Sequence, residues 1–176
     1  HLAASLLVFE HYRKRSPGLK ELMLLSLLTA SHARELAMLR NLPDPEEAHL
    51  CGMFRNLGEV LIAGYFPREY ARILQHLELK NKGESIACFE VLGFRYEELG
   101  EAMAKHWGMP ESVIIGIRAD GALSSSEIGV ITSFSHELTA AVYRREFDAK
   151  RDGVAEVLAR YAKRLSITRD EVAQIL

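Results

Sequence analysis

Apolar residues recur every three or four positions along almost the whole chain, which is the spacing of one face of an α-helix. No stretch alternates apolar and polar residues over the length of a strand. The sequence therefore predicts an all-α fold made of many helices in a single domain. The predicted helices cover residues 2–14, 19–40, 44–63, 67–79, 84–92, 95–107, 110–118, 125–147, 153–165 and a short segment after Thr168.

One segment of the second predicted helix, residues 22–30, is apolar almost all the way round. Such a helix offers no face to water, so we expect it to be a central, buried helix. It is shorter than the roughly 20 apolar residues that span a bilayer. The sequence therefore predicts no membrane segment.

Two helix starts carry capping signals. Asp44 can accept hydrogen bonds from free backbone N–H groups, Pro45 suits the first helical position, and two glutamates follow in the first turn. Near the end of the chain, Thr168 and Glu171 stand at the spacing of a capping box. We expect helices to begin at both places.

Arg55 and Asn56 stand side by side in the middle of a predicted helix. The apolar stripe of that helix consists of Leu50, Phe54, Leu57 and Leu61. Arg55 lies beside the stripe, which favours an arginine at the edge of a helix contact, paired with Glu59 or Asp120. Gly58 would let a second helix approach closely. The alternative is an anion-binding pocket around Arg55.

Composition and charge exclude several classes of function. The chain has 176 residues, of which 48% are hydrophobic and 26% charged, as in an ordinary soluble domain. Its net charge of −2 gives no electrostatic case for binding nucleic acid or an anionic membrane. The sequence shows no secretory signal, and we expect a cytoplasmic protein. Because the chain starts at His1 rather than at a methionine, we expect it to be a fragment of something longer.

The cysteines and histidines do not form a recognisable metal motif. Cys51 and Cys88 are far apart in apolar helical patterns, which predicts buried free thiols in a reducing compartment. Seven histidines are scattered along the chain, with no HExxH or equivalent spacing. We interpret them as surface or interface residues.

Several short patterns follow one another in a recognisable order. Ser26, Ala30, Ala33, Leu36 and Ala37 form the pattern S-x3-A-x2-A-x2-L-A. The segment DPEEAHLCGMFRNLGE, residues 44–59, opens with acids and leads to a second glycine. Glu90, Gly93, Gly100 and the WGMP of residues 107–110 come next. In this order and spacing the chain resembles the HDOD family, the regulatory relatives of the HD metal-dependent phosphohydrolases.

The resemblance implies an HD-like helical domain over residues 1–122. A helical C-terminal extension over residues 123–176 would pack on the same core. The N-terminal half of the family domain would precede His1 and be absent from this chain.

The resemblance also places the metal ligands of HD enzymes on unsuitable residues. The family's His-Asp pair falls on Arg55 and Asn56, an earlier histidine on Leu25, a later one on Tyr96, and a histidine pair near Asp120. Leucine has no lone pair, and arginine stays protonated where the cation would sit. Asparagine and tyrosine are poor ligands, and one carboxylate cannot hold a catalytic ion. We therefore expect no metal, no cofactor and no enzymatic activity.

The function implied by the resemblance is a non-catalytic bacterial signal-transduction domain that acts through a protein partner or a fused signalling domain. A first alternative is a sensor of a nucleotide or cyclic dinucleotide, bound near Arg55, Asn56, Tyr96 and Asp120. A second, less favoured, alternative is a divergent metal-dependent phosphohydrolase. For Tyr96, a role as an aromatic core residue competes with a role in ligand binding.

Overall fold

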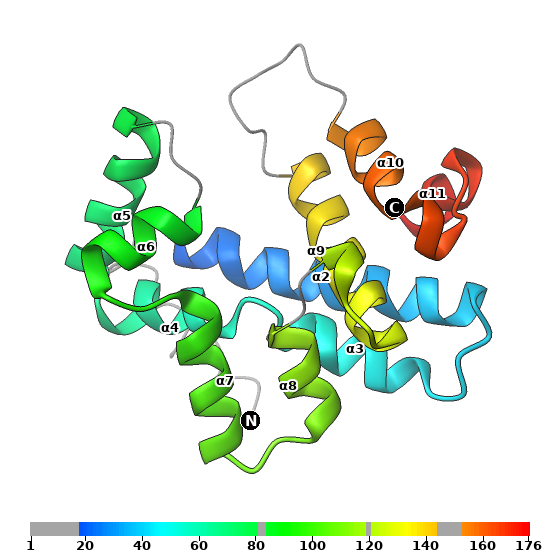
Figure 1. Ribbon diagram of the computed structural model, residues 1–176, viewed down its shortest axis with the longest axis horizontal. Helices are drawn as coiled ribbons and strands as arrows, with labels where there is room; N and C mark the ends of the chain where they lie inside the picture. The colour runs from blue at the N-terminus through cyan, green and yellow to red at the C-terminus, as the bar shows by residue number, and fades with distance from the viewer. Residues whose placement is uncertain (1–17, 81–83, 119–120, 144–152) are drawn as a thin grey trace. The chain divides into compact units, whose positions relative to one another are not determined.

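The computed structural model describes residues 18–80, 84–118, 121–143 and 153–176, and within them all regular structure is helical (Figure 1). The all-α prediction is therefore confirmed. The helix predicted over residues 2–14 lies outside the described residues. The elements are α2 (Leu19–Leu39), α3 (Pro45–Phe54), α4 (Leu57–Tyr65), α5 (Pro67–Lys80), α6 (Glu84–Leu92), α7 (Tyr96–His106), α8 (Glu111–Arg118), the 3-10 turn η1 (Gly121–Leu123), α9 (Glu127–Tyr143), α10 (Gly153–Leu165) and α11 (Arg169–Ile175).

The two predicted caps are confirmed. The Asp44 carboxylate accepts hydrogen bonds from the backbone N–H groups of Glu46 and Glu47, at 3.1 and 3.2 Å, and Pro45 is the first residue of α3. At α11, the Thr168 hydroxyl accepts from the Glu171 backbone at 3.2 Å. The Glu171 carboxylate in turn accepts from the Thr168 N–H at 2.8 Å. These bonds satisfy donors that the helix itself leaves open.

The prediction of one continuous helix over residues 44–63 is wrong at Arg55 and Asn56. Helix α3 ends at Phe54 with Arg55 as its C-cap, and α4 starts at Leu57 with Asn56 as its N-cap. Asn56 has φ −106° and ψ 27°, outside the helical range. Asparagine is common at N-cap positions, but the Asn56 side chain makes no capping hydrogen bond to α4. Leu50, Phe54 and Leu61 of the predicted apolar stripe are only half-buried. The break therefore also changes which side chains are buried.

The chain divides into two compact units. Unit 1 comprises residues 1–24 and 56–107, and unit 2 comprises residues 25–55 and 108–176. The division expected at residue 122 rests on the family resemblance and stays a prediction.

In unit 1 the closest helix contact joins α4 to α7 at Gly58. A Cβ atom at Gly58 would lie 1.9 Å from the backbone oxygen of Tyr96, so only glycine fits. The predicted close approach at Gly58 is therefore confirmed. Helices α5 and α6 pack on each other and close a core in which Leu22, Ile62 and Ile73 are almost fully buried.

In unit 2, α9 is the central helix, and α3, α8 and α10 pack on it. Its side chains Phe134 and Leu138 are fully buried beside Leu36 of α2 and Tyr161 of α10. The rings of Phe134 and Tyr161 meet edge to face, with centroids 5.4 Å apart.

Helix α2 is buried on one face, whereas its sequence predicts burial on all sides. Leu22 and Leu25 are buried, but Met23, Leu24 and Leu27 have exposed fractions of 38%, 53% and 55%. The prediction of a helix buried on all sides is therefore wrong for one face. By length and composition alone, α2 is also the one helix of the described part that could cross a membrane. Half of its most apolar window is buried within the fold.

Candidate functional site

The four residues predicted to form a binding site fall in different parts of the structure. Arg55 belongs to unit 2, whereas Asn56 and Tyr96 belong to unit 1. Asp120 lies outside the described residues.

Arg55 connects the end of α3 to the end of α8. Its Nη1 donates a hydrogen bond of 2.9 Å to the backbone oxygen of Ile117, in the last turn of α8. Carbonyl groups at this position have no partner inside their own helix, and a cation there is favourable. The half-buried side chain thus does structural work at the edge of a helix contact, as predicted. The predicted ion pair with Glu59 or Asp120 stays a prediction.

A polar cluster that the sequence did not predict lies near Arg55 in unit 2. The Tyr161 hydroxyl donates to Oε1 of Glu137 at 2.6 Å, and Arg160 forms a salt bridge to the other carboxylate oxygen. A Cβ atom at Gly121 would lie 3.1 Å from the Tyr161 hydroxyl and 3.3 Å from Glu137 Oε1. Gly121 has φ +59°, a conformation that glycine adopts without strain. Glycine at this position thus lets η1 sit directly on the Tyr161–Glu137 pair.

The electrostatics connect this cluster to Arg55. Burial raises the pKa of Tyr161 far above its ordinary value, and the hydrogen bond and negative charge of Glu137 raise it further. The positive charges of Arg160 and Arg55 act in the opposite direction on the same pKa. Tyr161 therefore stays protonated, as a donor to Glu137.

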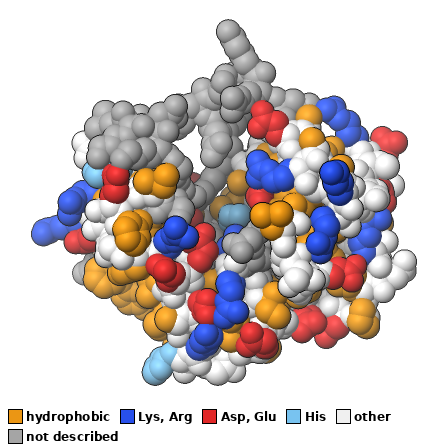
Figure 2. All heavy atoms as spheres, viewed as in Figure 1, with side chains coloured by type: hydrophobic (Ala, Val, Ile, Leu, Met, Phe, Trp, Pro, Cys, Tyr) orange, Lys and Arg blue, Asp and Glu red, His pale blue; other side chains and the backbone are white. Residues whose placement is uncertain are grey.

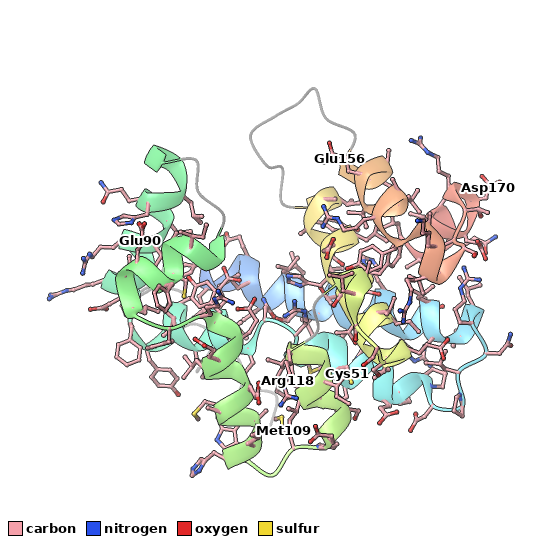
Figure 3. All side chains as sticks on the ribbon, in the orientation of Figure 1. Cys51, Glu90, Met109, Arg118, Glu156 and Asp170 are labelled. Atoms are coloured by element: carbon pink, nitrogen blue, oxygen red, sulfur yellow. The ribbon has the colours of Figure 1, made fainter. Side chains whose placement is uncertain are left out.

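Figure 3 labels Arg118, an exposed cation that follows Ile117 at the end of α8.

In unit 1, Asn56 and Tyr96 begin two helices that pack on each other. Both residues are buried, with exposed fractions of 8%, which agrees with the prediction of Tyr96 as an aromatic core residue. The Asn56 side-chain amide approaches the Leu22 carbonyl at 3.5 Å, the upper limit for a hydrogen bond. One turn further along α4, the buried carboxylate of Glu59 accepts a hydrogen bond of 3.0 Å from the Tyr70 hydroxyl. The sequence did not predict the Glu59–Tyr70 contact.

Leu25, on which the resemblance places an earlier histidine of the family, is part of the apolar core. Leu25 has an exposed fraction of 4%. Within the described ranges, no three or more His, Cys, Asp or Glu side chains come together in a way that could hold a metal ion.

Two predictions about titratable residues have clear outcomes. Cys51 and Cys88 are buried free thiols, as predicted, and burial raises the pKa of Cys51 to about 11. The interpretation of all histidines as surface or interface residues is wrong for His32, which is 3% exposed. Burial also lowers the pKa of His32. Its position one turn before Leu36 on the same helix face was the available sign of burial.

Comparison with known proteins identifies one family. The family model of the HDOD domain matches residues 1–122. An uncharacterized protein from Treponema pallidum is 28% identical over 72 residues, which are 41% of this chain but 14% of that protein.

Three solved structures have a similar fold. An HDOD domain protein of unknown function from Geobacter sulfurreducens has a TM-score of 0.67 and 19% identity, over 88% of this chain and 57% of that one. A candidate phosphohydrolase from Shewanella amazonensis has a TM-score of 0.65 and 19% identity, over 92% and 65%. A candidate signal transduction protein from Marinobacter aquaeolei has a TM-score of 0.64 and 20% identity, over 85% and 34%. The chain thus spans less than two thirds of each of these proteins, and at such identities the likeness establishes the fold alone.

Proposed function

The chain belongs to the HDOD family, a degenerate relative of the HD phosphohydrolases, and from this premise we propose that it is a non-catalytic signal-transduction domain. It would act in a bacterial cytoplasm by binding a protein partner or a fused signalling domain. The domain would signal through a change in how tightly it binds that partner. A ligand or partner shifts a conformational equilibrium only by the difference between its affinities for the two states.

The proposal rests on one observation: the residues that the resemblance places at the family's metal-ligand positions have structural roles. Leu25 is a core residue, and Arg55 donates to a helix-terminal carbonyl. Asn56 is the N-cap of α4. A hydrolytic metal site needs several lone pairs converging on the ion and an open position for water. These side chains supply neither.

The surface supports binding to another protein. In unit 1, Met23 and Leu24 expose apolar side chains, and exposed apolar surface of this kind is typical of protein interfaces. On the face seen in Figure 2, basic side chains over α10 and α11 are interspersed with acidic ones. Such mixed charge fits a protein partner better than the backbone of a nucleic acid.

A hydrolysis assay tests the absence of catalysis. We expect purified protein with added Mn²⁺ to hydrolyse phosphodiesters and nucleotides no faster than a protein-free blank. Hydrolysis that Arg55→Ala abolishes would overturn the proposal. Elemental analysis of protein purified without chelators is the second check. Stoichiometric iron, manganese or zinc would contradict the proposal that the domain is non-catalytic.

A second candidate function is a sensor of an anionic small molecule. It is favoured by the positive charges of Arg55 and Arg160, which both act on the Tyr161–Glu137 pair in unit 2. Arginine suits phosphate because its planar fork of donors matches two phosphate oxygens.

A thermal-shift screen with nucleotides and cyclic dinucleotides tests this second function. A ligand at a hundred times its Kd should stabilise the fold by about 2.7 kcal/mol. Arg55→Lys should weaken the shift, whereas Arg164→Ala, which removes an exposed cation of α10, should leave it unchanged. No shift with any phosphate ligand would rule out this candidate in favour of protein binding alone.

A further inference from the structure

The corner between α4 and α5, in unit 1, exposes two neighbouring aromatic side chains. Tyr65 is the last residue of α4, Phe66 is its C-cap, and Pro67 begins α5. The exposed fractions are 65% for Tyr65 and 53% for Phe66. Phe66 has φ −127° and ψ 58°, outside the helical range, so both rings stand where the chain turns from one helix into the next.

Basic side chains adjoin this corner on two helices. Arg68 and Arg72 are exposed and lie one turn apart on the same face of α5. The first turn of α2 also reaches the corner, because a Cβ atom at Gly64 would lie 4.0 Å from the Leu19 side chain. Lys20, which follows Leu19, is exposed. Three cations therefore accompany the two aromatic rings.

The charge around the corner is positive, although the whole chain carries a net charge of −2. Lys20, Arg68 and Arg72 are exposed, whereas of the acids beside them only Glu21 is exposed and Glu69 is half-buried. Salt screens exposed charges beyond about 10 Å. A surface that approaches the corner therefore responds to these local cations rather than to charges on remote parts of the chain.

Exposed aromatic rings beside cations match the chemistry of an anionic lipid surface. Tyrosine is enriched at the membrane–water interface, where its ring lies at the level of the headgroups. Lysine and arginine near an anionic bilayer are attracted to it, and each strengthens binding by about fivefold. A protruding corner can enter a soft headgroup layer, whereas a protein partner would need a hollow of matching shape.

We propose that the α4–α5 corner is a docking site for an anionic lipid surface. Tyr65 and Phe66 enter the headgroup region, while Lys20, Arg68 and Arg72 approach the lipid phosphates. Binding is reversible, because two aromatic side chains bury far less apolar surface than a helix that spans the bilayer. The site would hold the domain beside a membrane without opening its fold, whichever partner it signals to.

Vesicle co-sedimentation tests the site on the unchanged protein. We expect the protein to sediment with vesicles of equal parts phosphatidylcholine and phosphatidylglycerol at low salt. About 0.5 M salt should release it, because the attraction is electrostatic. Vesicles of phosphatidylcholine alone should bind at least about tenfold less protein. Equal binding to both vesicles, or binding to neither, would overturn the proposal. So would binding that salt does not reverse, because that result would indicate insertion of an apolar helix.

Phe66→Ser and Phe89→Ser form a matched pair of variants. The two side chains are almost equally exposed, at 53% and 55%. Phe89 lies on α6 beside Glu90, whose carboxylate pairs with His76 at 3.3 Å, so its neighbour is an acid instead of an arginine. Phe66→Ser should weaken vesicle binding by about tenfold, and Phe89→Ser by less than about twofold. Equal effects in variants with unchanged circular dichroism would contradict the proposed site.

Substitution of the arginines tests the electrostatic part. Arg68→Gln and Arg72→Gln should each weaken binding to the anionic vesicles by about fivefold. Arg164→Gln, which removes an exposed cation of α10 in unit 2, is the control and should change it by less than about twofold. An equal loss in all three variants would mean that general charge drives binding, against the proposal. If the protein binds soluble polyglutamate but not the vesicles, the corner recognises an acidic polypeptide and the proposal is wrong.

Discussion

Arg55 combines a structural contact with a permanent positive charge. Its guanidinium Nη1 donates a hydrogen bond to the last turn of α8. The permanent charge of arginine opposes the binding of a cation. The same charge acts on the neighbouring Tyr161, so the position keeps an electrostatic role.

Tyr161→Phe isolates the contribution of one hydroxyl to this region. The ring stays packed on Phe134, but the hydrogen bond to Glu137 is lost. Because Glu137 keeps a side-chain exposure of 26%, water can replace part of that bond. We expect a loss of about 1–2 kcal/mol in the free energy of unfolding, measured by urea denaturation. Tyr143→Phe, at a half-exposed tyrosine, should change it by less than about 0.5 kcal/mol.

His32 should make the stability of the protein depend on pH. Burial lowers its pKa in the folded state below the ordinary value of 6.5. The unfolded chain then binds a proton more readily than the folded one. The contribution of His32 to the free energy of unfolding should be constant above about pH 6.5. It should fall as the pH drops towards the folded pKa, by up to about 1.4 kcal/mol per pH unit.

Urea denaturation of the wild type and His32→Gln at several pH values measures this term. The difference in unfolding free energy between the two proteins should be flat above pH 6.5 and should shift in favour of the variant below it. Parallel pH profiles would show that His32 does not titrate differently in the folded state.

At the residue scale, the sequence predicted single environments better than pairs. The burial of Tyr96 and both cysteines follows from helical periodicity, which tells a buried face from an exposed one. The Tyr161–Glu137 contact joins two helices, and no periodicity says which helix a buried face will meet. The sequence therefore could not predict which residues surround Arg55, although it did predict the position of Arg55 at the edge of a helix contact.

Among the helices, the contact of α4 with α7 depends on a single glycine. A methyl group at Gly58 would collide with the Tyr96 backbone, which cannot rotate away. Gly58→Ala should therefore cost about 3 kcal/mol or more in unfolding free energy. Gly64→Ala in the same helix meets only a Leu19 methyl group at 4.0 Å. It should stabilise the protein by up to about 1 kcal/mol, because alanine favours helix. Equal effects in thermal denaturation would contradict the packing.

Helix starts with capping chemistry were predictable, and the break between α3 and α4 was not. Asp44 and Thr168 satisfy backbone donors within their own first turn, so their signals are local. At Arg55 and Asn56 no proline or glycine marks a stop, and apolar residues continue at helical spacing on both sides. The Arg55 bond to α8 and the close contact at Gly58 are tertiary, and they oppose the local preference to continue the helix.

On the scale of the whole molecule, the described residues form two apolar cores with no member in common. The core of unit 1 includes Leu22, Ile62 and Ile73, and that of unit 2 includes Leu36 and Phe134. The chain enters unit 1, leaves it within α2 and returns at Asn56. Periodicity predicted the helices but not this division, because a buried face does not reveal its partner.

Because the two cores are separate, a substitution that destabilises one core should lower the stability mainly of its own unit. Ile62→Ala and Phe134→Ala both leave cavities that should cost about 2–5 kcal/mol. We expect Ile62→Ala to lower the hydrogen-exchange protection of amides in α4, α5 and α7, and Phe134→Ala to lower it in α9 and α10. Each cooperative unit opens with its own free energy, so the undamaged unit should keep more of its protection.

Leu27→Ala is the control, because this exposed side chain should change the unfolding free energy by less than about 0.5 kcal/mol and alter neither pattern. A uniform loss of protection in both core variants would mean that the two units unfold as one. A partner that binds one unit would then stabilise the whole chain. If the losses are local, such a partner would stabilise only the unit it binds, and the rest of the protein would remain as free to open as before.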